Sequence, residues 1–134
     1  PADAAVCVAA VADWRPEDAG QRKLKRVKTG GPPPLALVEH PDILATLSQK
    51  GKNRPRLVVG FAAETDNVET HAKAKIAKKG CDWIIANDVS GDVMGGDANT
   101  VLVIRGDAVE AWPEMPKAAV ADRLAEAIAR ALTA

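Results

Sequence analysis

The chain has 134 residues, enough for one domain with a substantial hydrophobic core. Its 18 basic and 18 acidic residues cancel, and aromatic residues make up only 3%, so the composition argues against a nucleic-acid-binding protein. No apolar run approaches the roughly 20 residues that a membrane-spanning helix needs. We therefore expect neither a nucleic-acid partner nor a membrane partner.

Two cysteines, Cys7 and Cys81, each stand within an apolar segment. We expect buried free thiols rather than a disulfide, and no signal peptide is recognisable, so we expect a cytoplasmic protein. The chain begins without methionine and enters an apolar run within about five residues. We interpret this as the start of a fragment of a longer protein.

Residues 4–12 form an apolar run of small and β-branched side chains that ends at Asp13. A buried helix would also fit, but the β-branched content and the sharp polar stop favour a central parallel strand. Small residues near its carboxyl end, such as Ala9, would let a ligand approach the backbone. Asp13 would then lie at the edge of the sheet where ligands bind in such folds.

A basic segment follows, in which five cations occupy residues 22–28 between prolines and glycines. We predict that residues 15–34 are irregular, and irregular segments of this length are usually functional lids or linkers. A solvated basic loop without a ligand fits the charge equally well. The position directly after Asp13 favours a phosphate-neutralising lid, to which Lys23 and Lys25 would contribute.

Residues 35–39 are expected to form a short strand, and residues 41–49 a helix. In the central unit, residues 56–90, an apolar strand, a helix and a second apolar strand follow one another. Two buried parallel strands joined by a helix make a βαβ crossover, and ligands bind beyond the carboxyl ends of such strands. Residues 64–65 and 87–90 stand at those two ends.

The helix of the central unit is bounded by capping residues. Residues 66–67 supply N-cap chemistry, and Gly80 supplies a C-terminal cap. Lys75 lies seven residues after Val68, so we place it on the stripe that faces the sheet, and Lys79 extends that ridge. Both lysines could simply complement the helix dipole, which needs no ligand, or they could reach a polyanion.

Two features complete the predicted fold. Residues 99–105 and 108–112 are apolar runs that flank Gly106-Asp107, which is the turn chemistry of a β-hairpin. Apolar residues at helical spacing between positions 120 and 131 indicate a final amphipathic helix packed on the sheet. The residues thus predict an α/β fold with a mostly parallel sheet and an antiparallel C-terminal hairpin.

The sequence shows no spacing typical of a metal site, because its two cysteines and two histidines are scattered. His71 borders the packed side of the central helix, and we interpret it as structural. The phosphate-binding patterns G-x-x-x-x-G-K-[ST] and G-x-G-x-x-G are absent.

Five segments match a known family in order and spacing: Ala9–Arg15, Lys23–Arg26, Glu39–Leu44, Val59–Thr65 and Ala86–Ser90. Together they resemble bacterial phosphopantothenoylcysteine synthetase, the ligase half of the bifunctional coenzyme A biosynthesis flavoprotein. The resemblance covers nearly the whole chain. It implies a Rossmann-like, three-layer α/β/α domain that forms a homodimer and uses CTP with Mg²⁺.

The reaction implied by the resemblance joins 4′-phosphopantothenate to cysteine. The carboxylate attacks the α-phosphate of CTP and gives an acyl-cytidylate and pyrophosphate, and the amine of cysteine then displaces CMP. FMN is implied only where a decarboxylase domain is fused upstream.

The family's functional residues carry over one by one. Lys23 matches the lid lysine that is important for activity, and Lys75 and Lys79 match the pair that contacts the nucleotide phosphates. Ala9, Asp13 and Phe61 match positions around the nucleotide. Asn87 and Asp88 match the polar motif at the edge of the sheet.

Some features depart from the family pattern. Arg26 stands where lysine is usual, and His40 replaces an asparagine. The family's N-terminal half, with its I-S-N-x-S-S-G motif, is not in this sequence, so we expect no ligase turnover from this chain by itself. A non-catalytic nucleotide- or dinucleotide-binding module and a plain interaction domain remain alternatives.

Overall fold

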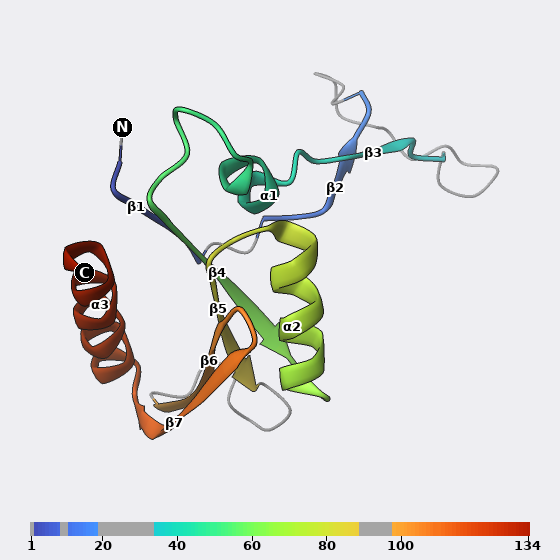
Figure 1. The fold of residues 1–134 in the computed structure, drawn as a ribbon. Helices are drawn as coiled ribbons and strands as arrows, with labels where there is room; N and C mark the ends of the chain where they lie inside the picture. The colour runs from blue at the N-terminus through green and yellow to red at the C-terminus, as the bar shows by residue number, and fades with distance from the viewer. Residues whose placement is uncertain (1, 9–10, 19–33, 89–97) are drawn as a thin grey trace. The chain divides into compact units, whose positions relative to one another are not determined.

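The computed structural model describes residues 2–8, 11–18, 34–88 and 98–134, and at Asp88 and Ala98 the description is limited to the backbone (Figure 1). The chain divides into two compact units. The larger unit comprises Pro1–Val8 and Ile43–Ala134, and the smaller comprises Ala9–Asp42. Within the described ranges, no helix is long and apolar enough to cross a membrane.

A five-stranded sheet forms the centre of the larger unit. Its strands are β1 (Ala4–Cys7), β4 (Leu57–Glu64), β5 (Trp83–Asp88), β6 (Ala98–Arg105) and β7 (Ala108–Pro116), in the spatial order β1-β4-β5-β6-β7. The β1–β4 and β4–β5 pairs are parallel, whereas β5–β6 and β6–β7 are antiparallel. The described sheet is therefore mixed, rather than mostly parallel as predicted, because the C-terminal hairpin joins it directly at β5.

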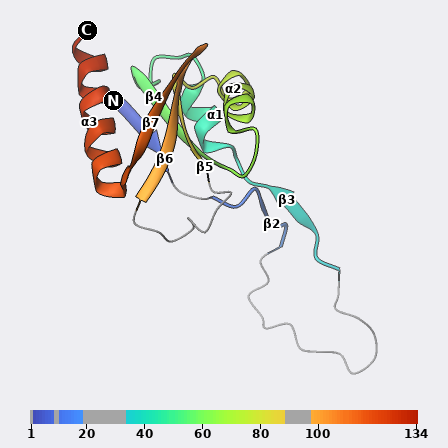
Figure 2. The same cartoon turned by 90° about the horizontal axis from the view of Figure 1, so that it is seen from below.

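Helices cover both faces of this sheet (Figure 2). On one face, α3 (Lys117–Thr133) buries Val120, Leu124 and Ala127 against residues of all the strands from β4 to β7. On the other face, α2 (Val68–Lys79) buries Ala72 and Ile76, and α1 (Ile43–Ser48) adds partly buried leucines. The expected three layers and the amphipathic final helix are thereby confirmed.

The central βαβ unit forms as predicted, with α2 connecting parallel strands β4 and β5. Gly80 caps the helix in the left-handed region, φ 71°, and its N–H donates to the Ile76 carbonyl. The predicted side-chain N-cap is wrong. Asn67 adopts φ 44° and makes no side-chain cap hydrogen bond, and its carbonyl accepts the first helical bond from His71. Asparagine tolerates this left-handed conformation better than most residues.

The C-terminal hairpin is also confirmed. Arg105 pairs with Ala108 across the turn, and Gly106 has φ 59°, a conformation that favours glycine. The second strand continues to Pro116, four residues past the predicted end at Trp112. The reason is that β6 remains paired as far as Ala98, opposite Pro116.

In the smaller unit, β2 (Trp14–Pro16) pairs antiparallel with β3 (Leu37–Glu39) as a separate two-stranded ribbon. The His40 N–H donates to the Asp13 carbonyl at 2.8 Å. The predicted first strand, residues 4–12, ends at Cys7, and the segment predicted to be irregular from Arg15 begins in β2. Residues 19–33, which carry most of the predicted basic lid, lie outside the described ranges.

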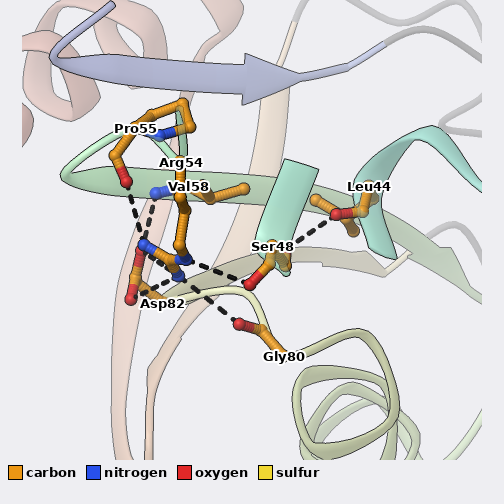
Figure 3. Close-up of polar contacts among 7 residues, drawn as sticks. All are labelled: Leu44, Ser48, Arg54, Pro55, Val58, Gly80 and Asp82. Atoms are coloured by element: carbon orange, nitrogen blue, oxygen red, sulfur yellow. Dashed lines mark hydrogen bonds and ion pairs between the residues drawn. The ribbon is translucent and has the colours of Figure 1, made fainter. Parts of the chain in front are cut away.

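Arg54 joins three parts of the larger unit (Figure 3). Its Nη2 donates to both oxygens of Asp82 at 3.0 Å, its Nε to the Ser48 carbonyl at 3.0 Å, and its Nη1 to the Pro55 carbonyl at 2.9 Å. Asp82 also accepts the Val58 N–H at 2.7 Å. Arg54 thus connects the end of α1, the segment that leads into β4 and the residue that precedes β5.

Candidate functional site

A group of charged side chains gathers at the carboxyl end of β4, on the face of the sheet covered by α2. Glu64 is its centre, with only 17% of its side chain exposed. Lys75 Nζ lies 3.3 Å from Glu64 Oε1, and His71 Nδ1 lies 3.5 Å from Glu64 Oε2. Asp66 stands at 3.8 Å from the same histidine nitrogen.

The sequence builds this group from two local periodicities. Side chains alternate along a strand, so Glu64 projects to the same face as Ala62, which packs in the core under α2. His71 and Lys75 are four residues apart on α2 and lie on one side of the helix. The end of β4 and one side of α2 therefore place the Glu64 carboxylate between the His71 imidazole and the Lys75 ammonium group.

Lys75 is suited to binding an anion, and its ion pair with Glu64 holds its side chain in place. Its ammonium group carries three donors, and its side chain is 34% exposed, so solvent-borne phosphate can reach it. Glu64 holds it at the end of the sheet, where ligands bind in α/β folds. Lys73, on the same helix, instead pairs with Glu69 at 2.7 Å in an exposed i,i+4 contact.

Lys79 lies one turn beyond Lys75, in the last turn of α2, and is half-buried. The two lysines form the ridge that the sequence predicts, because residues four apart share one side of a helix. The sequence places His71 at the border of the packed side of α2 and indicates a structural role. Its side chain is 47% exposed and contacts Glu64 in the charged group.

Phe61 and Asn87 belong to the opposite face of the same sheet edge. Phe61 packs on the core that α3 covers, and Asn87 lies two residues beyond Ile85, which is part of that core. Among the residues that the structure describes, Asn87 Oδ1 is buried without a hydrogen-bond partner, as is Oδ1 of Asn99 on β6. Sequence reasoning missed Asn99, because nothing in its local pattern separates it from a surface strand residue.

Four predicted site residues remain, of which the structure describes two. Asp13 is exposed in the smaller unit. The Asp88 backbone pairs in register with Glu64. Ala9 and Lys23 lie outside the described residues. The convergence of Lys23 with Lys75 and Lys79 therefore stays a prediction.

The described histidines, cysteines and carboxylates form no group of three or more that could hold a metal ion. Both cysteines are free, Cys81 buried and Cys7, against expectation, only half-buried. Burial raises the pKa of the Cys81 thiol, so it stays protonated and is a poor nucleophile. The chemistry of the site therefore rests on its charged and amide side chains.

Comparison with known proteins identifies the family. The DNA/pantothenate metabolism flavoprotein C-terminal domain matches residues 1–132. The chain belongs to this family. Membership confirms the resemblance to the phosphopantothenoylcysteine synthetase part of the bifunctional coenzyme A biosynthesis proteins.

The chain is also similar to individual proteins named for coenzyme A biosynthesis. The chain is 44% identical over 97 residues to the "Coenzyme A biosynthesis bifunctional protein CoaBC" of Vibrio parahaemolyticus, covering 72% of this chain and 24% of that protein. It is 36% identical over 137 residues to the protein of that name from Mycobacterium tuberculosis strain H37Rv, covering 95% and 32%. It thus spans about a quarter to a third of these relatives' lengths.

One solved structure supports the same family, and a second shows the same fold. The crystal structure of the C-terminal domain of a CoaBC protein superposes with a TM-score of 0.71 at 32% identity, covering 98% of this chain and 55% of that one. The DNA/pantothenate metabolism flavoprotein from Streptococcus pneumoniae also superposes with a TM-score of 0.71, covering 96% and 63%. Its 19% identity makes that likeness one of fold alone.

Proposed function

We propose that this chain supplies the CTP phosphate-binding part of a phosphopantothenate–cysteine ligase in coenzyme A biosynthesis. The observation that carries the proposal is Lys75, a half-buried ammonium held by Glu64 at the carboxyl end of β4. Lys79 lies on the same side of α2 one turn away. The family match over residues 1–132 supports the same assignment.

In the proposed reaction, the carboxylate of 4′-phosphopantothenate attacks the α-phosphate of CTP. A C(O)O–P bond forms, the bond to the β-phosphate breaks, and pyrophosphate leaves. Lys75 and Lys79 stabilise the charge that develops on the leaving pyrophosphate. The amine of cysteine then attacks the acyl carbon, CMP leaves with the bonding pair, and the amine loses one proton as the amide forms.

To meet a phosphate, Lys75 exchanges its contact with Glu64 for one with the nucleotide. Glu64 keeps a polar neighbour during that exchange, because its second oxygen faces His71 Nδ1 at 3.5 Å. A carboxylate left without a partner would be costly at 17% exposure, so this second contact lowers the barrier to releasing the lysine. The group is suited to holding a lysine ready for an anion.

The other residues take roles around the nucleotide in this proposal. Ala9, Asp13 and Phe61 line it, Asn87 and Asp88 form the polar edge, and Lys23 closes over the phosphates from the lid. Mg²⁺ is expected to arrive with CTP, because it binds largely through substrate phosphates and one or two carboxylates. We also propose a cytoplasmic homodimer, with FMN only where a decarboxylase domain is fused.

Calorimetric titration of this chain with CTP, ATP and NADPH, each with Mg²⁺, tests the proposal. CTP should bind more tightly than ATP, and NADPH should not bind. Lys75→Gln should weaken CTP binding about tenfold or more, since it removes one charge-assisted contact. Lys73→Gln is the matched control, because it removes one lysine from an exposed pair on the same helix. Preferential NADPH binding would instead support the dinucleotide-binding module.

The lid assignment needs a ligase that contains the complete synthetase. In such a protein, Lys23→Gln should slow pyrophosphate release in the presence of CTP and 4′-phosphopantothenate. Acyl-cytidylate formation at the unchanged rate would refute a role for Lys23.

A further inference from the structure

A cavity of about 340 Å³ opens between α3 and strands β5, β6 and β7, on the face of the sheet away from α2. Six large side chains dominate its lining: Arg105, Arg123, Arg130, Glu110, Trp83 and Trp112. Alanines of α3 complete the wall. A volume of this size falls at the lower end of the range for small-molecule sites.

Two of the arginines are stacked on the two tryptophans. The Cζ atom of Arg105 lies 4.4 Å from the ring centroid of Trp83, and Cζ of Arg123 lies 4.4 Å from that of Trp112. Trp83 and Arg105 stand directly opposite each other in the β5–β6 pair, which fixes the first stack. Cation–π stacking immobilises both guanidinium groups and so lowers the entropy lost when they bind a ligand.

Glu110 holds the two stacked arginines together. Its Oε1 accepts from Trp112 Nε1 at 2.8 Å and from Arg123 Nη2 at 3.1 Å, and Arg105 Nη2 lies 3.4 Å from its Oε2. The Trp112 hydrogen bond, with the two arginines, lowers the pKa of Glu110, which therefore stays ionised at neutral pH. The carboxylate organises the cluster.

The charges in the lining do not balance. Three arginines and one glutamate line the cavity, and Glu110 pairs with both Arg105 and Arg123, so these two guanidinium groups share one negative charge. The acid that pairs with Arg130 is Glu126, 3.6 Å away on the outer side of α3 and outside the lining. Within the described part of the chain, Arg105 Nε is also buried without a hydrogen-bond partner. Leaving such a donor unpaired is costly.

We propose that this cavity binds a small organic anion: a carboxylate or phosphate ester attached to a flat apolar body. The oxyanion would bind the guanidinium donors that Glu110 does not occupy, and the apolar body would lie against the alanines of α3 that line the cavity. Lys75 and Glu64 belong to the other face of the sheet. Phe61 and Asn87 share the face of the cavity but lie further toward the carboxyl ends of β4 and β5, whereas Trp83 begins β5. The cavity is therefore separate from the proposed nucleotide site and does not depend on it.

Tryptophan fluorescence provides the test. The chain has three tryptophans, and Trp14→Phe leaves only the two that line the cavity. Phenyl phosphate should change the emission of this variant saturably, with a dissociation constant of about 1 mM or below. Phenol lacks the anion and inorganic phosphate lacks the apolar body, so each should bind more weakly. No saturable change with phenyl phosphate overturns the proposal.

Three substitutions and one control variant separate a binding site from a purely structural cluster. Arg105→Gln and Arg123→Gln should each weaken binding about tenfold, whereas Lys117→Gln, an exposed charge on α3, should leave it unchanged. Glu110→Gln keeps an oxygen that can accept from Trp112 Nε1 and Arg123 Nη2 but removes the negative charge that competes with the ligand, so binding should tighten.

Several outcomes would refute the site. Unchanged affinity in both arginine variants overturns it, as does weaker binding in Glu110→Gln. Loss of binding in Lys75→Gln, or displacement of phenyl phosphate by CTP, would place the anion in the nucleotide site instead. If an arginine variant unfolds in a urea titration, Glu110→Gln and the three-ligand comparison still decide the question.

Discussion

Replacing Arg54 should destabilise the larger unit more than breaking an exposed ion pair does. Arg54→Met keeps most of the side-chain volume but removes the bidentate contact with Asp82 and the donor to the Ser48 carbonyl. Arg54 is only 18% exposed and Asp82 35%, so water replaces these bonds incompletely. Hydrogen bonds to charged groups contribute about 1.5–3 kcal/mol, so we expect a loss of about 2–3 kcal/mol.

Urea unfolding followed by circular dichroism measures this loss, and thermal unfolding should show a fall of about 8–12 °C in Tm. A double-mutant cycle with Asp82→Asn should give a coupling energy of about 1–2 kcal/mol that persists at high salt, because the pair is partly buried. The control is Lys73→Met, whose exposed pair with Glu69 should contribute only about 0.3–0.5 kcal/mol. A coupling energy below about 0.5 kcal/mol, or equal losses in Arg54→Met and Lys73→Met, would refute this reasoning.

Three further predictions concern packing and protonation. Gly60→Ala should cost about 1–3 kcal/mol by urea unfolding, because the new Cβ would lie 2.5 Å from Leu44 Cδ2; an unchanged midpoint would show that Leu44 moves aside freely. The folded-state pKa of Glu110 is lowered, so its stabilising effect is present above its usual value of 4.5 and is lost as the pH falls through the folded-state pKa. The urea midpoints of the wild type and Glu110→Gln should therefore converge at acid pH, and a constant difference would contradict the assignment. The raised pKa of Cys81 predicts that iodoacetamide modifies it far more slowly at pH 8 than a free cysteine peptide, and equal rates would show that the thiol is accessible.

Local patterns in the sequence determined most of the larger unit. The apolar spacing along α2, Gly80 at its end and Gly106 in the hairpin turn act over a few residues, so they can be read directly from the chain. The ordered motifs also identified the family that residues 1–132 match. The sequence also predicted that Lys75 and Lys79 share one side of α2, because helical geometry alone decides which residues lie on the same side.

Tertiary structure decided what lies between distant segments. Sequence could not show that β3 pairs with β2 instead of the large sheet, or that Glu64 faces both His71 and Lys75. Arg54 and Asp82 are 28 residues apart, and no local pattern relates them. The arginine–tryptophan cavity likewise needs β5, β6, β7 and α3 in place. Such contacts depend on strand order and on which face each strand turns toward a helix, and those are fixed only when the whole sheet packs.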